Sequence, residues 1–247
     1  TLTVDNAAKD YTLKGSATKA TAFNALARLN NADTVVGGSA TTDSLTATVT
    51  SLDATTGALK VSAVEKLILT NAGTAVVGLA ATSGVTDVTL TGTGTKTTLT
   101  GLAAGTSITV GGTPTGGSAG QYTGGVDVAL ADATGAADAL TVNLTGAGTA
   151  VLTTWTTTGI ETVNLVGDAA MDVQNLDVNA VTASSLVVTG GNTTTAVALS
   201  LAGGASAGTA GTTKLNAATT SVDASAYNGA VTAFAATNTA TNFKAKV

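Results

Sequence analysis

Histidine and cysteine are both absent from this chain of 247 residues. Without histidine there is no imidazole to act as a general base, to complete a Ser-His-Asp or Cys-His site, or to bind zinc. Without cysteine there are no disulfide bonds and no thiolate chemistry, although this absence alone does not fix the cellular compartment. The commonest forms of nucleophilic and zinc-dependent catalysis are therefore excluded.

Charged and aromatic side chains are also scarce. Charged residues make up 10% of the chain, whereas an average soluble domain has about 25%. The formal net charge is −5, and the 10 Lys and Arg residues are scattered along the chain. No basic stripe is therefore present to neutralise phosphate groups, and we expect no nucleic-acid partner.

Long apolar runs are missing as well. No run reaches the ~18 residues that indicate a transmembrane helix, so we expect no transmembrane segment. The chain starts at Thr1 without the pattern of a signal peptide. This start indicates a mature chain or an internal piece of a longer one.

The residues that remain are small or β-branched. Hydrophobic residues make up 44% of the chain, mostly Ala, Val and Leu, and Thr and 30 Gly fill much of the rest. Small and β-branched side chains favour thin, regular β layers over a core built on large aromatics. Disorder is not expected, because disordered chains combine low hydrophobicity with high charge.

A strand-like phrase recurs along the sequence. Thr-Val-Asn-Leu begins at Thr141 and again at Thr162, 21 residues later. Leu69 and Leu90 show the same interval, and Leu144, Leu165 and Leu186 continue it. Within residues 162–165, alternation sends Val and Leu to one face and Thr and Asn to the other.

Units this short cannot close separate cores, but they can bury their apolar faces by stacking. We therefore predict an all-β fold, a parallel β-solenoid of about ten coils. An array of small antiparallel β-sandwich domains is the alternative, since it also has short strands and Gly-rich turns. Hairpin dipeptides are scarce, the only Asn-Gly being Asn228-Gly229, and this favours the solenoid.

One segment has helical spacing. Residues 16–31 place Ala22, Leu26 and Leu29 on one helical face, which predicts a short helix near the N-terminus that covers the end of the solenoid. We accordingly expect a capping region at residues 1–45 and a repeat body at residues 46–247. Residues 111–117, which hold the sole proline, are the expected break in that body.

The candidates for paired-carboxylate catalysis are Asp residues that lie near one another in sequence: Asp127, Asp132, Asp138, Asp168 and Asp172. A glycosidase needs two carboxylates across a sugar, usually in a cleft lined by aromatic rings. With one Trp, three Tyr and three Phe, such a platform is hard to build. Most of these Asp residues lie beside Gly, Ala or Thr, where turn hydrogen bonding explains them. We therefore expect no enzyme.

Calcium is the bound species that the sequence favours. Residues 37–45, GGSATTDSL, resemble the repeat-in-toxin phrase Gly-Gly-x-Gly-x-Asp, whose carbonyls and carboxylates bind Ca²⁺ in a parallel β-roll. Ala40 stands at the last glycine position of the phrase, and Asp43 comes one residue late. With Asn30 and Asp33 as further oxygen donors, we predict a calcium site at Asn30, Asp33 and Asp43. Ordinary turn hydrogen bonding is the alternative.

Threonine pairs raise a further hypothesis. Thr-x-Thr occurs at Thr46/Thr48 and Thr89/Thr91, and ordered threonine ladders are typical of ice-binding solenoids. The pairs do not recur at the 21-residue interval, because Asn164 and Val166 stand at corresponding positions further on. Threonine also suits any half-exposed strand face, so the ladder alone does not indicate ice binding.

Four phrases together resemble a known class of protein. They are DTVVGGSATTDSLTATV at residues 33–49, SAVEKLILTNAG at 62–73, TTGIETVNLVG at 157–167 and VDASAYNGAVT at 222–232. They are similar to modules of bacterial surface-layer (S-layer) proteins and related adhesins exported by type I secretion, a class with repeat-in-toxin-like segments.

The resemblance implies a structural protein with a β-solenoid body. It also implies calcium-dependent self-assembly into a two-dimensional crystalline coat on the surface of a Gram-negative cell, with contacts to cell-surface polysaccharide or lipopolysaccharide through other parts of a parent chain. The C-terminal export signal of the class is not visible in the final residues, TNFKAKV, so we expect an internal piece. A stalk of a secreted adhesin is the main alternative, and ice-binding and polysaccharide-active solenoids are two others.

Overall fold

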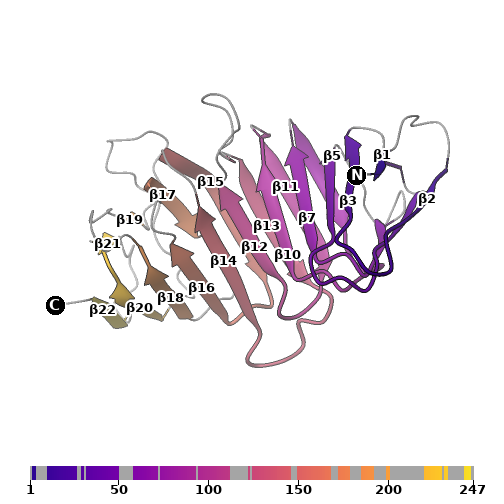
Figure 1. Cartoon of the computed structure of the whole chain (residues 1–247). Helices are drawn as coiled ribbons and strands as arrows, with labels where there is room; N and C mark the ends of the chain where they lie inside the picture. Colours follow the sequence, from indigo (N-terminus) through magenta and orange to yellow (C-terminus); the bar gives the residue numbers. More distant parts are fainter. Residues whose placement is uncertain are drawn as a thin grey trace.

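The computed structural model is an all-β protein built from stacked, parallel coils of a β-solenoid (Figure 1). The coils follow one another along the molecule in sequence order, and the two termini lie at opposite ends (Figure 1). The structure describes residues 2–3, 10–26, 29–30, 32–49, 58–71, 73–92, 94–111, 122, 124–145, 149–167, 172–178, 185–191, 199–200, 220–229, 231–232 and 242–245.

One face of the solenoid is an 11-stranded parallel sheet, named the long sheet below. It takes one strand from each successive coil, so the coil count differs slightly from the ten that the sequence predicts. Its strands, in spatial order, are β1 (Leu2–Thr3), β3 (Ala22–Leu26), β5 (Ser44–Val49), β7 (Lys66–Asn71), β10 (Asp87–Thr91), β12 (Ser107–Gly111), β14 (Ala139–Thr145), β16 (Thr162–Gly167), β18 (Ser185–Gly190), β20 (Ser221–Tyr227) and β22 (Asn242–Ala245).

Shorter parallel sheets form the other faces. The five-stranded sheet contains β8 (Thr74–Gly78), β11 (Lys96–Leu102), β13 (Gly125–Leu130), β15 (Thr149–Thr158) and β17 (Asp172–Val178). A four-stranded sheet at the N-terminal end contains β2 (Thr12–Lys14), β4 (Thr34–Val36), β6 (Lys60–Ser62) and β9 (Thr82–Ser83). A two-stranded sheet contains β19 (Leu199–Ser200) and β21 (Val231–Thr232).

The core is a set of apolar columns that run through the stack. Strands such as β5, β14 and β16 alternate strictly between buried and partly exposed residues, as the period of two in the sequence predicts. In one column Leu45, Leu67 and Val88 lie directly above one another, each fully buried. Burial of such a side chain contributes about 1.5–3 kcal/mol, so coils that are too small to fold alone stabilise one another.

The 21-residue interval is one of several coil lengths. Leu69 and Leu90 are direct neighbours on β7 and β10, which confirms that prediction. Further on, however, Leu165 lies opposite Val142, and the coil there is two residues longer. Because strand side chains alternate with a period of two, a shift of two residues keeps the same face inward. The sequence pattern therefore identifies consecutive coils but not the register between them.

The N-terminal segment is a strand, and the prediction of a helix over residues 16–31 is wrong. β3 pairs in parallel with β1 and β5, and Phe23 and Ala25 point into the core. Pairing on both edges outweighs the weak helical pattern, because tertiary contacts override local propensity. The described residues contain no helix that is long and apolar enough to cross a membrane.

The expected organisation of the chain can be placed on this fold. Residue 45, where the sequence predicts the capping region to end, lies inside β5, and the coils on either side of it share the long sheet. β12 ends at Gly111, so the break expected over residues 111–117 falls almost wholly outside the described residues.

Candidate functional site

Asp43 lies at a corner of the solenoid, directly before β5, and is fully buried. One carboxylate oxygen accepts a hydrogen bond from the backbone N–H of Thr21 in the preceding coil at 2.5 Å. The other accepts from the backbone N–H of Gly38 in its own coil, also at 2.5 Å. Charge-assisted bonds of this kind are among the stronger hydrogen bonds in proteins. Asp43 therefore ties two consecutive coils together.

Asp33 holds an equivalent place before β4 and is 2% exposed. Its carboxylate accepts hydrogen bonds from the backbone N–H of Tyr11 at 2.7 Å and from that of Asn30 at 2.8 Å. The Asn30 side-chain oxygen accepts from the backbone N–H of Ala32 at 2.8 Å. Asn30 and Asp33 thus belong to one turn, and Asp33 links that turn to Tyr11 in the preceding coil.

Carboxylates recur at this corner in other coils. The backbone N–H of Asp43 donates to the Glu65 carboxylate at 2.7 Å, and the backbone N–H of Asp138 donates to the Glu161 carboxylate at 2.8 Å. Each acceptor lies one coil later, directly before a strand of the long sheet. We name these residues the corner column: Asp43, Glu65, Asp138 and Glu161. The carboxylates of Asp43, Glu65 and Glu161 satisfy backbone donors where the coil turns, as buried backbone groups require.

The three predicted calcium ligands are brought together only in part. Asn30 and Asp33 share a turn, whereas Asp43 has a separate set of partners, Thr21 and Gly38. Calcium needs six to eight oxygen ligands, and within the described part of the chain no group of three or more acidic side chains is placed to hold a metal ion. The turn hydrogen bonding that the sequence left open accounts for these contacts, and calcium binding stays a prediction.

The Gly-Gly pair of the calcium-like phrase has a steric role. A Cβ on Gly38 would lie 1.7 Å from the carbonyl oxygen of Ser16, and one on Gly37 would lie 1.5 Å from that of Ala63. Neither distance is compatible with any side chain. The two glycines therefore let the backbones of neighbouring coils approach at the corner that Asp43 closes.

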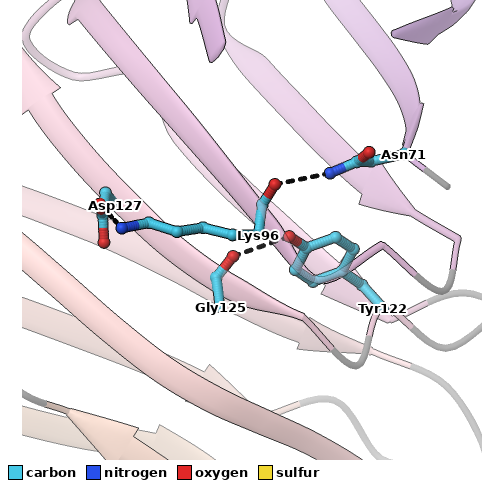
Figure 2. Close-up of polar contacts among 5 residues, drawn as sticks. All are labelled: Asn71, Lys96, Tyr122, Gly125 and Asp127. Carbon is cyan, nitrogen blue, oxygen red and sulfur yellow. Dashed lines mark hydrogen bonds and ion pairs between the residues drawn. The ribbon is translucent and has the colours of Figure 1, made fainter. Parts of the chain in front are cut away.

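A chain of buried polar groups fills the next corner of the solenoid (Figure 2). The Asn71 side-chain amide donates to the Lys96 carbonyl at 2.8 Å and to the Thr97 hydroxyl at 2.9 Å. The Tyr122 hydroxyl lies 2.8 Å from that of Thr97 and donates to the Gly125 carbonyl at 2.7 Å. Since a phenol has one hydrogen and a carbonyl only accepts, Thr97 donates to Tyr122.

This chain crosses three coils and is satisfied at every step. Asn71, Thr97 and Tyr122 are all buried, and burial raises the pKa of Tyr122 although the hydrogen bond with Thr97 opposes that rise. Sequence reasoning did not find this group, because its members are 25 and 26 residues apart and nothing local marks them as partners. An Asn directly before a turn was the only visible signal.

Hydroxyl and charged groups also interact on the outer surface. The Asp87 carboxylate accepts from the hydroxyls of Thr89 at 2.7 Å, Ser107 at 3.0 Å and Thr109 at 2.6 Å. On the five-stranded sheet Lys96 forms an ion pair with Asp127 (Figure 2). Both contacts join neighbouring coils, so the outer side chains reinforce the stack.

The threonine side chains form a more regular ladder in the structure than the 21-residue interval of the sequence indicates. Thr48, Thr70 and Thr91 occupy the same position on β5, β7 and β10, and the hydroxyls of Thr70 and Thr91 are 2.8 Å apart. In the neighbouring row, Ile68 stands between Thr46 and Thr89. The ladder is thus regular over three coils in one row and interrupted in the next.

Of the other Asp residues that the sequence offers as paired carboxylates, Asp127 forms an ion pair with Lys96. Asp132 accepts from the backbone and hydroxyl of Thr134, and these bonds lower the pKa of its carboxyl. Asp138 has one carboxylate oxygen that is buried without a hydrogen-bond partner. Asp168 lies outside the described residues, and Asp172 begins β17.

No protein-family model, no curated protein and no solved structure matches this chain.

Proposed function

We propose that this chain is a structural segment of a bacterial surface-layer subunit, which self-associates and covers the cell as a two-dimensional coat. The observation that carries the proposal is the long sheet, whose 11 parallel strands form one continuous face along the stack. Such a face offers the same geometry at every coil, which suits repeated contacts in a lattice. The resemblance of four sequence phrases to surface-layer modules supports the same conclusion.

The chemistry of the described side chains suits contact more than catalysis. The carboxylates of Asp43, Glu65 and Glu161 accept backbone hydrogen bonds, and the outer carboxylate of Asp87 is held by three hydroxyls. Side chains held in this way lose little further conformational freedom on association. Each contact between copies is weak, but a lattice multiplies weak contacts through multivalency.

The proposal includes export and calcium binding because the resemblance to surface-layer proteins implies both. We place the chain outside the cell, exported by type I secretion. Calcium would be held near Asn30, Asp33 and Asp43 or between neighbouring subunits, because carboxylate and amide oxygens are its usual ligands. The backbone contacts of Asp33 and Asp43 leave lone pairs that a cation can still use.

Electron microscopy of the purified 247-residue chain tests the proposal. We expect ordered sheets when calcium is present and smaller or disordered assemblies after chelation. A matched sample with magnesium in place of calcium separates a specific ion effect from ionic strength. Sheets that are indifferent to the chelator would remove calcium from the proposal and leave the coat.

A stalk of a secreted adhesin is the second candidate. The termini lie at opposite ends of the stack (Figure 1), and this arrangement also suits a spacer that holds a binding domain away from the cell. Isolated rods at every protein concentration, with or without calcium, would favour the stalk and contradict the coat.

A further inference from the structure

The corner that follows β20 carries the only Asn-Gly pair of the chain, Asn228-Gly229. β20 ends at Tyr227 and β21 begins at Val231, so the pair lies in the bend between two strands. Tyr227 is fully buried, whereas Asn228 and Gly229 are half-buried. The backbone N–H of Asn228 donates to the carbonyl of Gly190 at 2.9 Å. The pair therefore lies where two consecutive coils are tied together.

Asparagine is one of the chemically labile residues of proteins, and a glycine after it allows a reaction within the chain. The backbone nitrogen of Gly229 loses its proton to solvent and attacks Cγ of the Asn228 side chain. The new N–Cγ bond closes a cyclic succinimide as the Cγ–Nδ2 bond breaks, and the side-chain nitrogen leaves as ammonia. Water then opens the ring at either carbonyl carbon and gives an aspartate or an isoaspartate. Because glycine has no Cβ, nothing on the attacking residue hinders the approach.

Other asparagines are held away from this reaction by their positions in the fold. Asn71 is 1% exposed, and its side-chain amide donates to the Lys96 carbonyl and the Thr97 hydroxyl. Asn143 lies within β14, which pairs with a strand on each side. A ladder fixes the backbone in an extended conformation and engages its N–H groups, so the next nitrogen is not free to attack. Asn228 combines a glycine neighbour with a position outside the strands.

From this placement we propose that Asn228 is a site of spontaneous deamidation, at which the folded chain converts a side-chain amide into a carboxylate. The inference is independent of the proposed coat. Each conversion adds a negative charge to a chain whose formal net charge is −5. An isoaspartate also inserts an extra carbon into the main chain between β20 and β21, next to the bond that Asn228 donates to Gly190.

The inserted carbon enters a closely packed corner. Tyr227 directly precedes Asn228 and is fully buried, and a Cβ on Gly191 would lie 2.8 Å from its ring. Packing this close leaves little space for a longer main chain. We therefore expect the isoaspartate to loosen the pairing of β20 with β18. Distant coils should keep their pairing, because each coil of a solenoid contacts only its neighbours.

Incubation of the folded chain tests the inference. The whole chain is kept at neutral and at mildly alkaline pH, and samples are digested at acidic pH for peptide mass spectrometry with fragmentation. A second sample is kept unfolded in urea under the same conditions. The control variants are Asn228→Gln, whose longer side chain disfavours the ring, and Gly229→Ala, which adds a Cβ to the attacking residue. Circular dichroism establishes that both variants retain the fold.

We expect the peptide that contains Asn228 to gain about one dalton as an NH₂ group is replaced by OH, and to become a substrate for an isoaspartyl methyltransferase. The rate near neutral pH should rise about tenfold per pH unit, because the attacking nitrogen reacts after losing its proton. Gly229→Ala should convert about tenfold more slowly, and Asn228→Gln should not convert at this position. Asn71 should stay unchanged in the folded chain.

Three outcomes would overturn the inference. Conversion of Asn228 in urea but not in the folded chain would show that the bend holds the side chain and the attacking nitrogen apart. Equal rates in the unaltered chain and in Gly229→Ala would show that the glycine does not direct the reaction. Conversion of Asn71 as fast as that of Asn228 in the folded chain would show that the position in the fold has no effect.

Hydrogen exchange of the converted chain tests the expected effect on the stack. Backbone amides of β18 and β20 should exchange faster than in the unconverted chain, whereas those of β7 and β10 should be unchanged. Equal protection of β18 and β20 before and after conversion would contradict the loosening of this corner.

Discussion

Asp43 offers the sharpest test of the corner column. Its carboxylate accepts two backbone hydrogen bonds, from Thr21 and Gly38, and it is fully buried. The amide of Asp43→Asn keeps one oxygen acceptor but turns an NH₂ group toward the other backbone donor. The variant therefore loses one of the two bonds and places two donors against each other.

The expected loss follows from the number of backbone donors left without an acceptor. A buried donor without a partner costs about 1–3 kcal/mol. Asp43→Asn leaves one such donor and should lower the free energy of unfolding by about 1–3 kcal/mol. Asp43→Ala leaves two and should lower it by about 2–6 kcal/mol. For a chain of this size, the midpoint of thermal unfolding falls by about 2–4 °C per kcal/mol.

Urea unfolding followed by far-ultraviolet circular dichroism measures both losses. Each variant and the unaltered chain are measured once in the presence of calcium and once in the presence of a chelator. Because repeat proteins can unfold in parts, fluorescence of the single tryptophan, Trp155, provides a second probe. Asp132→Asn is the control. Asp132 is exposed and bonded within its own turn, so Asp132→Asn should leave the free energy of unfolding nearly unchanged.

The reasoning also predicts how the ion affects the result. The backbone bonds of Asp43 need no cation, so the loss in Asp43→Asn should persist in the chelator. If chelation instead lowers the stability of the unaltered chain to that of the variant, the carboxylate acts through a bound ion and the hydrogen-bond explanation is refuted.

Further substitutions test other parts of the structure. Tyr122→Phe leaves the Gly125 carbonyl without its donor and should cost about 1–3 kcal/mol by urea unfolding. Folding raises the pKa of Tyr122, so this side chain contributes to stability below the ordinary tyrosine pKa of about 10 and loses that contribution as the pH rises further. Above pH 10 the unaltered chain should therefore lose more stability than Tyr122→Phe. Leu90→Ala opens a cavity in a fully buried column and should cost about 2–5 kcal/mol. Gly38→Ala brings a methyl group to 1.7 Å from a backbone oxygen, and we expect thermal unfolding at a lower temperature than for Gly105→Ala. At Gly105 a Cβ meets nothing within 4 Å, and the only strain comes from its positive φ.

The strands were predictable because alternation of apolar and polar residues is a local property. Strands such as β14 and β16 follow directly from the pattern of residues 139–145 and 162–167. Their register did not follow, since any even shift leaves the same residues buried. The short helix was predicted wrongly for a related reason. Phe23 and Ala25 are buried by β1 and β5 on either side, and pairing of this kind is not visible in a single segment.

The turn positions of Asp33 and Asp43 were predictable, but their hydrogen-bond partners were not. Asp33 and Asp43 do lie at turns, and their partners include backbone groups 22 residues earlier in the chain. The group of Asn71, Thr97 and Tyr122 was missed because it exists only once three coils are stacked. Short-range patterns identify which residues face inward, whereas contacts between coils depend on the exact length of each coil.

The stacking register is the claim on which the corner column and the buried polar chain both depend. Since the chain has no cysteine, disulfide formation between introduced pairs measures that register directly. Asn143 and Val166 are direct neighbours on β14 and β16, about 4.8 Å apart and within the range that a disulfide bridges. Asn143→Cys with Val166→Cys should therefore oxidise within one chain. Asn143→Cys with Asn164→Cys, which follows the 21-residue interval, should not, and efficient bridging of the second pair but not the first would contradict the structure.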